Sequence, residues 1–136
     1  MGIRRKGREL ALRALYQIEM TGDASPAAVE FFLGYFEGRT KARDFARRLV
    51  SGVITHRGEI DQIIEQSADH WRLTRMAKVD LTILRMAAYE LLFCPDIPVN
   101  VSMDEAIEIG KRYGSGDSAT FINGILDQVA LSGGVK

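Results

Sequence analysis

The sequence predicts an all-α fold, and two observations carry that prediction. Apolar residues recur at intervals of three and four along most of the 136-residue chain, which is the spacing of one face of an α-helix. No stretch shows the alternation of apolar and polar residues that is typical of a half-buried strand. Hydrophobic residues make up 46% of the chain and charged residues 26%, a balance typical of a packed domain and not of a disordered chain. We therefore expect about seven helices, in one domain or in one domain built from two small halves, as the length of the chain suggests.

The first half is expected to hold four helices, each with apolar residues at helical spacing. Ser25 and Pro26 predict the start of the second one, because serine is a favoured N-cap and proline fits the first helical position. The expected ranges are about Arg4–Met20, Pro26 to about Gly38, about Lys41–His56 and roughly Gly58–Ser67.

The second half begins with the most apolar helix, expected from Ala77 to Phe93. Because it is apolar nearly all round, we expect it at the centre of the fold. Ser102 to Glu105 has the pattern of a capping box, which predicts a helix from there to Tyr113. Asp117 or Ser118 is expected to cap the last helix. Asn123-Gly124 inside that helix would be a hairpin turn by local rules, but the helical period around it overrides them, and Gly124 is expected at a close helix crossing.

Catalytic chemistry is not indicated. His56, His70 and Cys94 have no ligand or nucleophile spacing, so structural roles are expected for them. The acids Asp104, Glu105 and Glu108 lie in the first turns of a helix, where its dipole favours negative charge. No phosphate-binding glycine loop and no site for a metal or cofactor is found. The sequence therefore predicts a protein that is not an enzyme.

The net charge of zero is the sum of two opposed halves. Residues 1–57 hold eleven bases and six acids, which gives +5, and residues 58–136 hold seven bases and twelve acids, which gives −5. Such asymmetry can mark a nucleic-acid partner, although solvated helix faces produce the same counts.

The basic half opens with residue types that suit single-stranded RNA. Cations bind phosphates, planar side chains stack on bases, and amides read base edges. A frayed basic terminus followed by an ordinary helix would contain the same residues, so the pattern alone leaves both interpretations open. The residues concerned are Arg4, Arg5, Lys6, Arg8, Arg13, Tyr16 and Gln17.

A membrane location is not predicted, because no segment reaches the roughly 18 consecutive apolar residues that a spanning helix needs. The basic start leads into an amphipathic helix rather than into a signal peptide. The single cysteine, Cys94, fits a reducing cytoplasm.

Three blocks of sequence resemble a known family, the bacterial transcription antitermination factor NusB. Leu12-Arg13 and Met103-Asp104 are minor departures from the family pattern. The blocks follow one another at the expected separation, and the resemblance extends over nearly the whole chain. They are RRKGRELALRALYQIE, VDLTILRMAAYELLFCPDIPVNVSMDEAIEIGKRYG and DSATFINGILD.

The resemblance implies a single all-helical domain of two three-helix halves, about residues 1–70 and 71–136, with the first helix extended by a basic N-terminal arm. Proteins of this family bind the boxA element of ribosomal RNA leader transcripts as single-stranded RNA. They do so with NusE, a ribosomal protein, within the RNA polymerase antitermination complex, and without catalysis. Whether two copies pair through the basic face stays open.

The resemblance also implies roles for particular residues. Asp80 would contact the basic ribosomal partner, as opposite charges favour. Tyr16 and Phe121 fit a core position equally well, because aromatic residues dominate cores too. The residues expected to meet RNA are Arg4, Arg5, Lys6 and Arg8 in the arm, Tyr16 and Gln17 on the first helix, and Asp117, Ser118, Phe121 and Asn123 at the last helix.

Two other classes of protein compete with this interpretation. A helix-turn-helix DNA regulator would use residues 118–131 as its recognition helix, but that stretch contains no Lys or Arg, which disfavours groove binding. A helical protein-interaction or dimerisation module without RNA specificity is the other alternative. RNA titration with and without the protein partner separates it from an antitermination factor.

Overall fold

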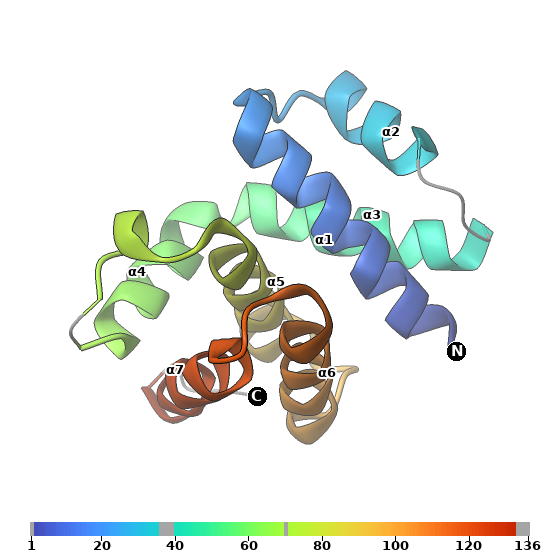
Figure 1. Ribbon diagram of the computed structural model, residues 1–136. Coiled ribbons are helices and arrows are strands. Elements are labelled where there is room, and N and C mark those ends of the chain that lie inside the picture. The colour runs from blue at the N-terminus through green and yellow to red at the C-terminus, as the bar shows by residue number, and fades with distance from the viewer. Residues whose placement is uncertain (1, 36–39, 70, 133–136) are drawn as a thin grey trace. The chain divides into compact units, whose positions relative to one another are not determined.

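The computed structural model describes residues 2–35, 40–69 and 71–132, and these residues form seven α-helices, one 3-10 turn and no strand (Figure 1). The all-α prediction is confirmed. The helices are α1 (Ile3–Thr21), α2 (Pro26–Tyr35), α3 (Thr40–Thr55), α4 (Arg57–Ser67), α5 (Lys78–Phe93), α6 (Val99–Tyr113) and α7 (Ser118–Ser132), with the turn η1 (Leu73–Arg75) before α5.

The chain divides into two compact units, Met1–Thr55 and His56–Lys136. The boundary therefore lies earlier than the expected position near residue 70, and the second unit holds four helices rather than three. The reason is that α4 packs on α5 and α7. A bidentate ion pair adds to this packing: Arg85 on α5 donates hydrogen bonds of 2.8 and 3.0 Å to Asp61 on α4.

The first unit is built on the crossing of α1 over α3 (Figure 1). Gly7 lies at the crossing, where a Cβ would come within 2.8 Å of the Ala42 carbonyl oxygen and 2.9 Å of the Phe45 ring. Ala11, Ala14, Leu15 and Ile18, which share one face at helical spacing, are buried as predicted, whereas Ile3 and Met20 near the two ends of α1 are exposed. Glycine thus lets the two helix backbones approach closely.

Helix α2 starts where the sequence predicts. The Ser25 hydroxyl accepts a hydrogen bond of 3.2 Å from the Ala28 amide, as an N-cap does. Val29 and Leu33, on the inner face of the helix, are buried. The expected positions Phe36 and Gly38 lie outside the described residues.

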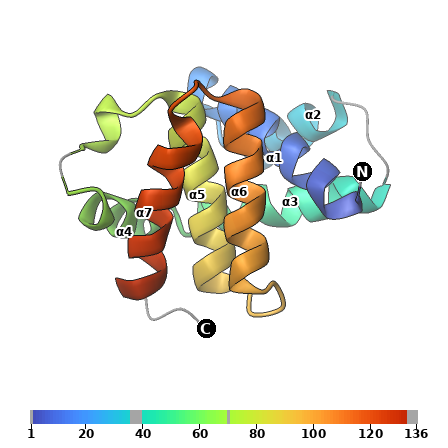
Figure 2. The same ribbon diagram turned by 60° about the horizontal axis from the view of Figure 1, so that its bottom comes forward.

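In the second unit, α5, α6 and α7 lie side by side (Figure 2). Most of α5 is buried, so the expectation of a central helix is confirmed for this unit. Gly110 on α6 lets α7 approach, because a Cβ there would lie 3.0 Å from Cδ1 of Ile122.

The structure corrects the predicted role of Gly124. That residue is inside a helix, as expected, but nothing lies within 4 Å of where its Cβ would be. Helical period alone does not tell which glycine faces a neighbouring helix, and the close approach falls at Gly110 instead.

The predicted capping box at Ser102 is also wrong. Helix α6 starts at Val99, after Pro98, so Ser102 lies inside the helix and not at its N-cap. Its hydroxyl is buried and donates a hydrogen bond of 2.8 Å to Oε1 of the buried Glu90 on α5. The serine satisfies a buried carboxylate instead of capping a helix.

Several smaller expectations can be compared with the structure. Cys94 is buried, as predicted. His56 stacks on Phe93 with ring centroids 4.0 Å apart, and His70 lies outside the described residues. No helix among the described residues is long and apolar enough to cross a membrane.

Candidate nucleic-acid interface

One side of α1 carries cations, an amide and an aromatic ring. Lys6, Arg13 and Gln17 fall on one line along the helix, because separations of seven and eleven residues return to nearly the same face. Arg5 and Tyr16 fall on the adjacent line. Lys6 and Arg13 are exposed, and the other three side chains are half-buried. All five therefore reach the surface of the first unit, opposite the apolar side of the helix.

Arg4 and Arg8 lie on a different side of α1. Their guanidinium carbons are 5.0 and 5.3 Å from the centre of the Phe45 ring on α3, within reach of a cation–π interaction. Arg4 is exposed at the start of the helix, whereas only 2% of Arg8 is exposed. Arg8 is therefore not accessible for the expected contact with phosphate, because its side chain is buried against Phe45.

The start of α7 carries the second expected group. Asp117 is exposed and precedes the helix, and its carbonyl oxygen accepts a hydrogen bond of 3.1 Å from the Phe121 amide. Phe121 and Asn123 are half-buried. Ser118 is only 1% exposed, so it leaves the candidate surface, while the other three residues remain on it.

Ser118 and Asp80 are buried as a hydrogen-bonded pair. The Ser118 hydroxyl donates a hydrogen bond of 2.6 Å to Oδ1 of Asp80, which lies in the first turn of α5. Asp80 is 8% exposed. The expected contact from Asp80 to a protein partner is not supported by this placement, because the carboxylate is turned into the second unit.

Trp71 is a surface residue that sequence reasoning missed. Its side chain is 48% exposed, and its ring meets the ring of Phe121 edge to face, with centroids 5.5 Å apart. The signal in the sequence was a lone tryptophan followed by Arg72 and Arg75. Exposure of a tryptophan, however, depends on how distant segments pack.

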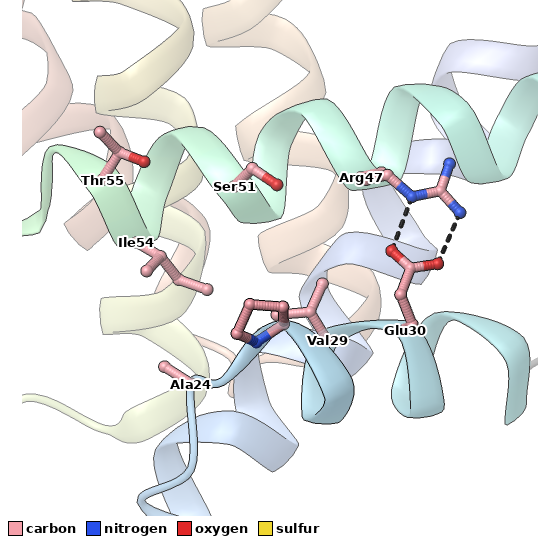
Figure 3. A pocket seen from close by; sticks show the side chains of 8 residues that line it. Ala24, Val29, Glu30, Arg47, Ser51, Ile54 and Thr55 are labelled. Carbon is pink, nitrogen blue, oxygen red and sulfur yellow. Dashed lines mark hydrogen bonds and ion pairs between the residues drawn. The ribbon is translucent and has the colours of Figure 1, made fainter.

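A hollow of about 230 Å³ lies between α2 and α3 (Figure 3). At its edge, Arg47 donates hydrogen bonds of 2.8 and 2.9 Å to the two carboxylate oxygens of Glu30. The hydrogen bonds raise the pKa of Arg47 and lower that of Glu30. The charges of Arg47 and Glu30 therefore satisfy each other at the edge of the hollow.

The described residues hold no group of three His, Cys, Asp or Glu side chains that could bind a metal ion. Fold and surface together define the class: an all-α protein of two helical units whose candidate site is a cationic helix face. Within that class, the chain belongs to the NusB family, whose sequence profile matches residues 5–131.

Relatives and solved structures agree with this family. The chain is 51% identical to the transcription antitermination protein NusB of Geobacter sulfurreducens, over 96% of this chain and 95% of that one. It is 48% identical to the protein of the same name from Myxococcus xanthus, over 97% of each chain.

Among solved structures, T. maritima NusB is 40% identical, with a TM-score of 0.85 over 95% of this chain and 91% of that one. A structure described as antitermination factors NusB and NusE in complex with dsRNA shares the fold. Its matching chain is 23% identical, with a TM-score of 0.84 over 97% of this chain and 98% of that one.

Proposed function

We propose that this protein is a transcription antitermination factor that binds boxA-type RNA together with NusE. Its role is to help RNA polymerase read through termination sites in ribosomal RNA leader transcripts. The proposed function is binding and not catalysis, and it places the protein in the cytoplasm, where bacterial transcription occurs.

The observation that carries the proposal is the accessible face of α1. Lys6 and Arg13 are exposed on one line with Gln17, and Arg5 and Tyr16 reach the surface beside them. Cations for phosphates, an amide for base edges and a ring for stacking are the groups that single-stranded RNA recognition uses. Two relatives that are 48% and 51% identical to this chain are both transcription antitermination proteins, which supports the same function.

The structure described as NusB and NusE with dsRNA supports the choice of partners, because one of its chains has this fold. On the second unit, Asp117, Phe121 and Asn123 at the start of α7 form a separate group of proposed RNA contacts. We do not include Arg8, Ser118 or Asp80 in it, since all three are buried.

Fluorescence anisotropy with a labelled boxA RNA tests the proposal. We expect weak binding by the protein alone, tighter binding when NusE is added, and preference over a scrambled RNA. The logarithm of the affinity should fall with the logarithm of salt concentration by about 0.7 for each phosphate neutralised on a single strand.

Equal affinity for boxA and scrambled RNA, with and without NusE, would contradict the proposal. It would favour a helical interaction module instead. Light scattering in the same buffers shows whether two copies pair, and displacement of a dimer by RNA would place the pairing surface on the basic face.

A further inference from the structure

We propose that Trp71 and Phe121 form a stacking platform for an unpaired nucleobase on the second unit. This inference rests on the proposed RNA-binding function and adds to it a site formed by the segment before α5 and the first turns of α7. The base stacked there would belong to the bound RNA strand.

The geometry of the aromatic pair leaves ring surface available. The ring planes of Trp71 and Phe121 make an angle of 77°. An edge-to-face pair covers one face of one ring, whereas a stacked pair covers a face of each. Trp71 is 48% exposed although it touches Phe121. A large planar ring is therefore held in place by a neighbour while much of its surface meets solvent.

Two cations that follow Trp71 in the chain favour a nucleic acid over an apolar protein segment. Arg72 and Arg75 are both exposed and follow Trp71 within four residues, in a unit whose net charge is negative. Proteins that bind single-stranded nucleic acids place cations beside aromatic rings, because phosphates flank every stacked base. The exposed carboxylates of Asp69 and Asp117 lower this positive potential locally, but carboxylates also suit hydrogen bonds to base amino groups.

Gly124 supplies an independent observation on the same helix. It lies three residues after Phe121, so the two are neighbours on the surface of α7. A mid-helix glycine costs about 1 kcal/mol relative to alanine, and here no packing contact accounts for it, because nothing lies within 4 Å of its Cβ position. An open backbone beside an aromatic platform leaves room for a ligand to approach the helix closely.

Tryptophan fluorescence tests the platform directly, because Trp71 is the single tryptophan of the chain. The probe is an unlabelled single-stranded boxA RNA, and binding is followed in parallel by anisotropy of the same RNA carrying a label. Stacking of a base on the indole quenches its emission. We expect quenching that saturates at the RNA concentration where the anisotropy saturates.

Substitutions separate stacking from folding. Trp71→Ala should weaken RNA binding roughly 5- to 100-fold, as loss of a base–aromatic stack does, while Trp71→Phe should recover most of it. Gly124→Gln should raise the melting temperature, because it adds a helix-favouring residue in open space, yet weaken RNA binding by covering the approach. Gly58→Gln on α4 is the matched control, since its Cβ position is also open.

Each outcome bears on one of the two proposals. RNA binding by anisotropy with unchanged tryptophan emission, and with Trp71→Ala and Gly124→Gln binding normally, would overturn the platform and leave the proposed function standing. Absence of RNA binding, alone or with NusE, would overturn both. Quenching by NusE and not by RNA would show that the pair is a protein contact and would overturn the inference.

Discussion

Ser118 at the start of α7 donates a hydrogen bond of 2.6 Å from its hydroxyl to Oδ1 of Asp80 in the first turn of α5. The same hydroxyl accepts a hydrogen bond of 2.8 Å from the Ser115 amide. Two helices that begin far apart in the sequence are thereby joined at their N-terminal ends. Both residues were expected on binding surfaces, but both are buried, and the bond satisfies their polar atoms away from water.

Ser118→Ala should destabilise the protein. The substitution removes the donor and leaves the buried Asp80 carboxylate without this hydrogen bond, which costs roughly 1–3 kcal/mol of unfolding free energy. Urea denaturation followed by circular dichroism measures the loss. Ser132→Ala is the control, because its hydroxyl bonds only the preceding turn at an exposed helix end. An unchanged stability in Ser118→Ala would show that the bond contributes nothing.

Gly7→Ala should also destabilise the protein, by about 1–3 kcal/mol, which is typical of overpacking. The added methyl group would meet the Ala42 carbonyl and the Phe45 ring at the crossing of α1 and α3. Gly34→Ala on α2 is the matched variant, because its Cβ position is open, and it should gain up to about 1 kcal/mol. Thermal unfolding compares the two. Equal effects of the two substitutions on stability would mean that α1 and α3 can move apart to admit the methyl group without a loss of unfolding free energy.

The cations of α1 should divide into two kinds. Lys6→Ala and Arg13→Ala, at exposed positions, should weaken RNA binding for every sequence and reduce the salt slope by about 0.7 each, without changing the melting temperature. Arg8→Ala should lower the melting temperature instead, since its side chain packs on Phe45. Anisotropy titrations at several salt concentrations and thermal unfolding measure the two effects.

Lys111→Ala on α6 is the control for this series, because it removes an exposed cation outside the proposed surface. A loss of RNA affinity in Lys111→Ala as large as in Lys6→Ala would indicate general electrostatic attraction and would argue against a defined site on α1.

The ion pair of Glu30 and Arg47 predicts a pH dependence. The hydrogen bond from Arg47 lowers the pKa of Glu30 below its ordinary value of 4.5, so folding favours the ionised carboxylate. This stabilisation is fully present when the pH is above the pKa of Glu30 in the unfolded state. It disappears as the pH falls through the lower pKa of Glu30 in the folded state. Since the Glu30 side chain is 56% exposed, solvent screening limits the effect to less than about 1 kcal/mol.

Denaturation of the protein and of Glu30→Gln across this acidic range measures the contribution. The variant should be slightly less stable near neutral pH, and the two stabilities should converge below the folded-state pKa of Glu30. A difference that persists unchanged into strong acid would mean that the charge of Glu30 is not its source.

Local features of this protein could be predicted from the sequence because they depend on neighbours a few residues away. The apolar period predicts where the helices lie, and Ser25 and Pro26 predict the start of α2. The line of Lys6, Arg13 and Gln17 also follows from the period of one helix alone. Five of the seven predicted RNA-binding side chains on α1 lie on that side, so this part of the candidate site needed no tertiary information.

The tertiary structure decided which polar and glycine positions face another helix. Ser118 and Asp80 are 38 residues apart, and Arg8 is buried through its contact with Phe45 on α3. Likewise, Gly110 and not Gly124 marks the helix crossing, and Trp71 lies beside Phe121 on the surface. Helical period gives the direction of a side chain from its own axis. Burial depends on which distant segment packs there, and only the assembled fold sets that.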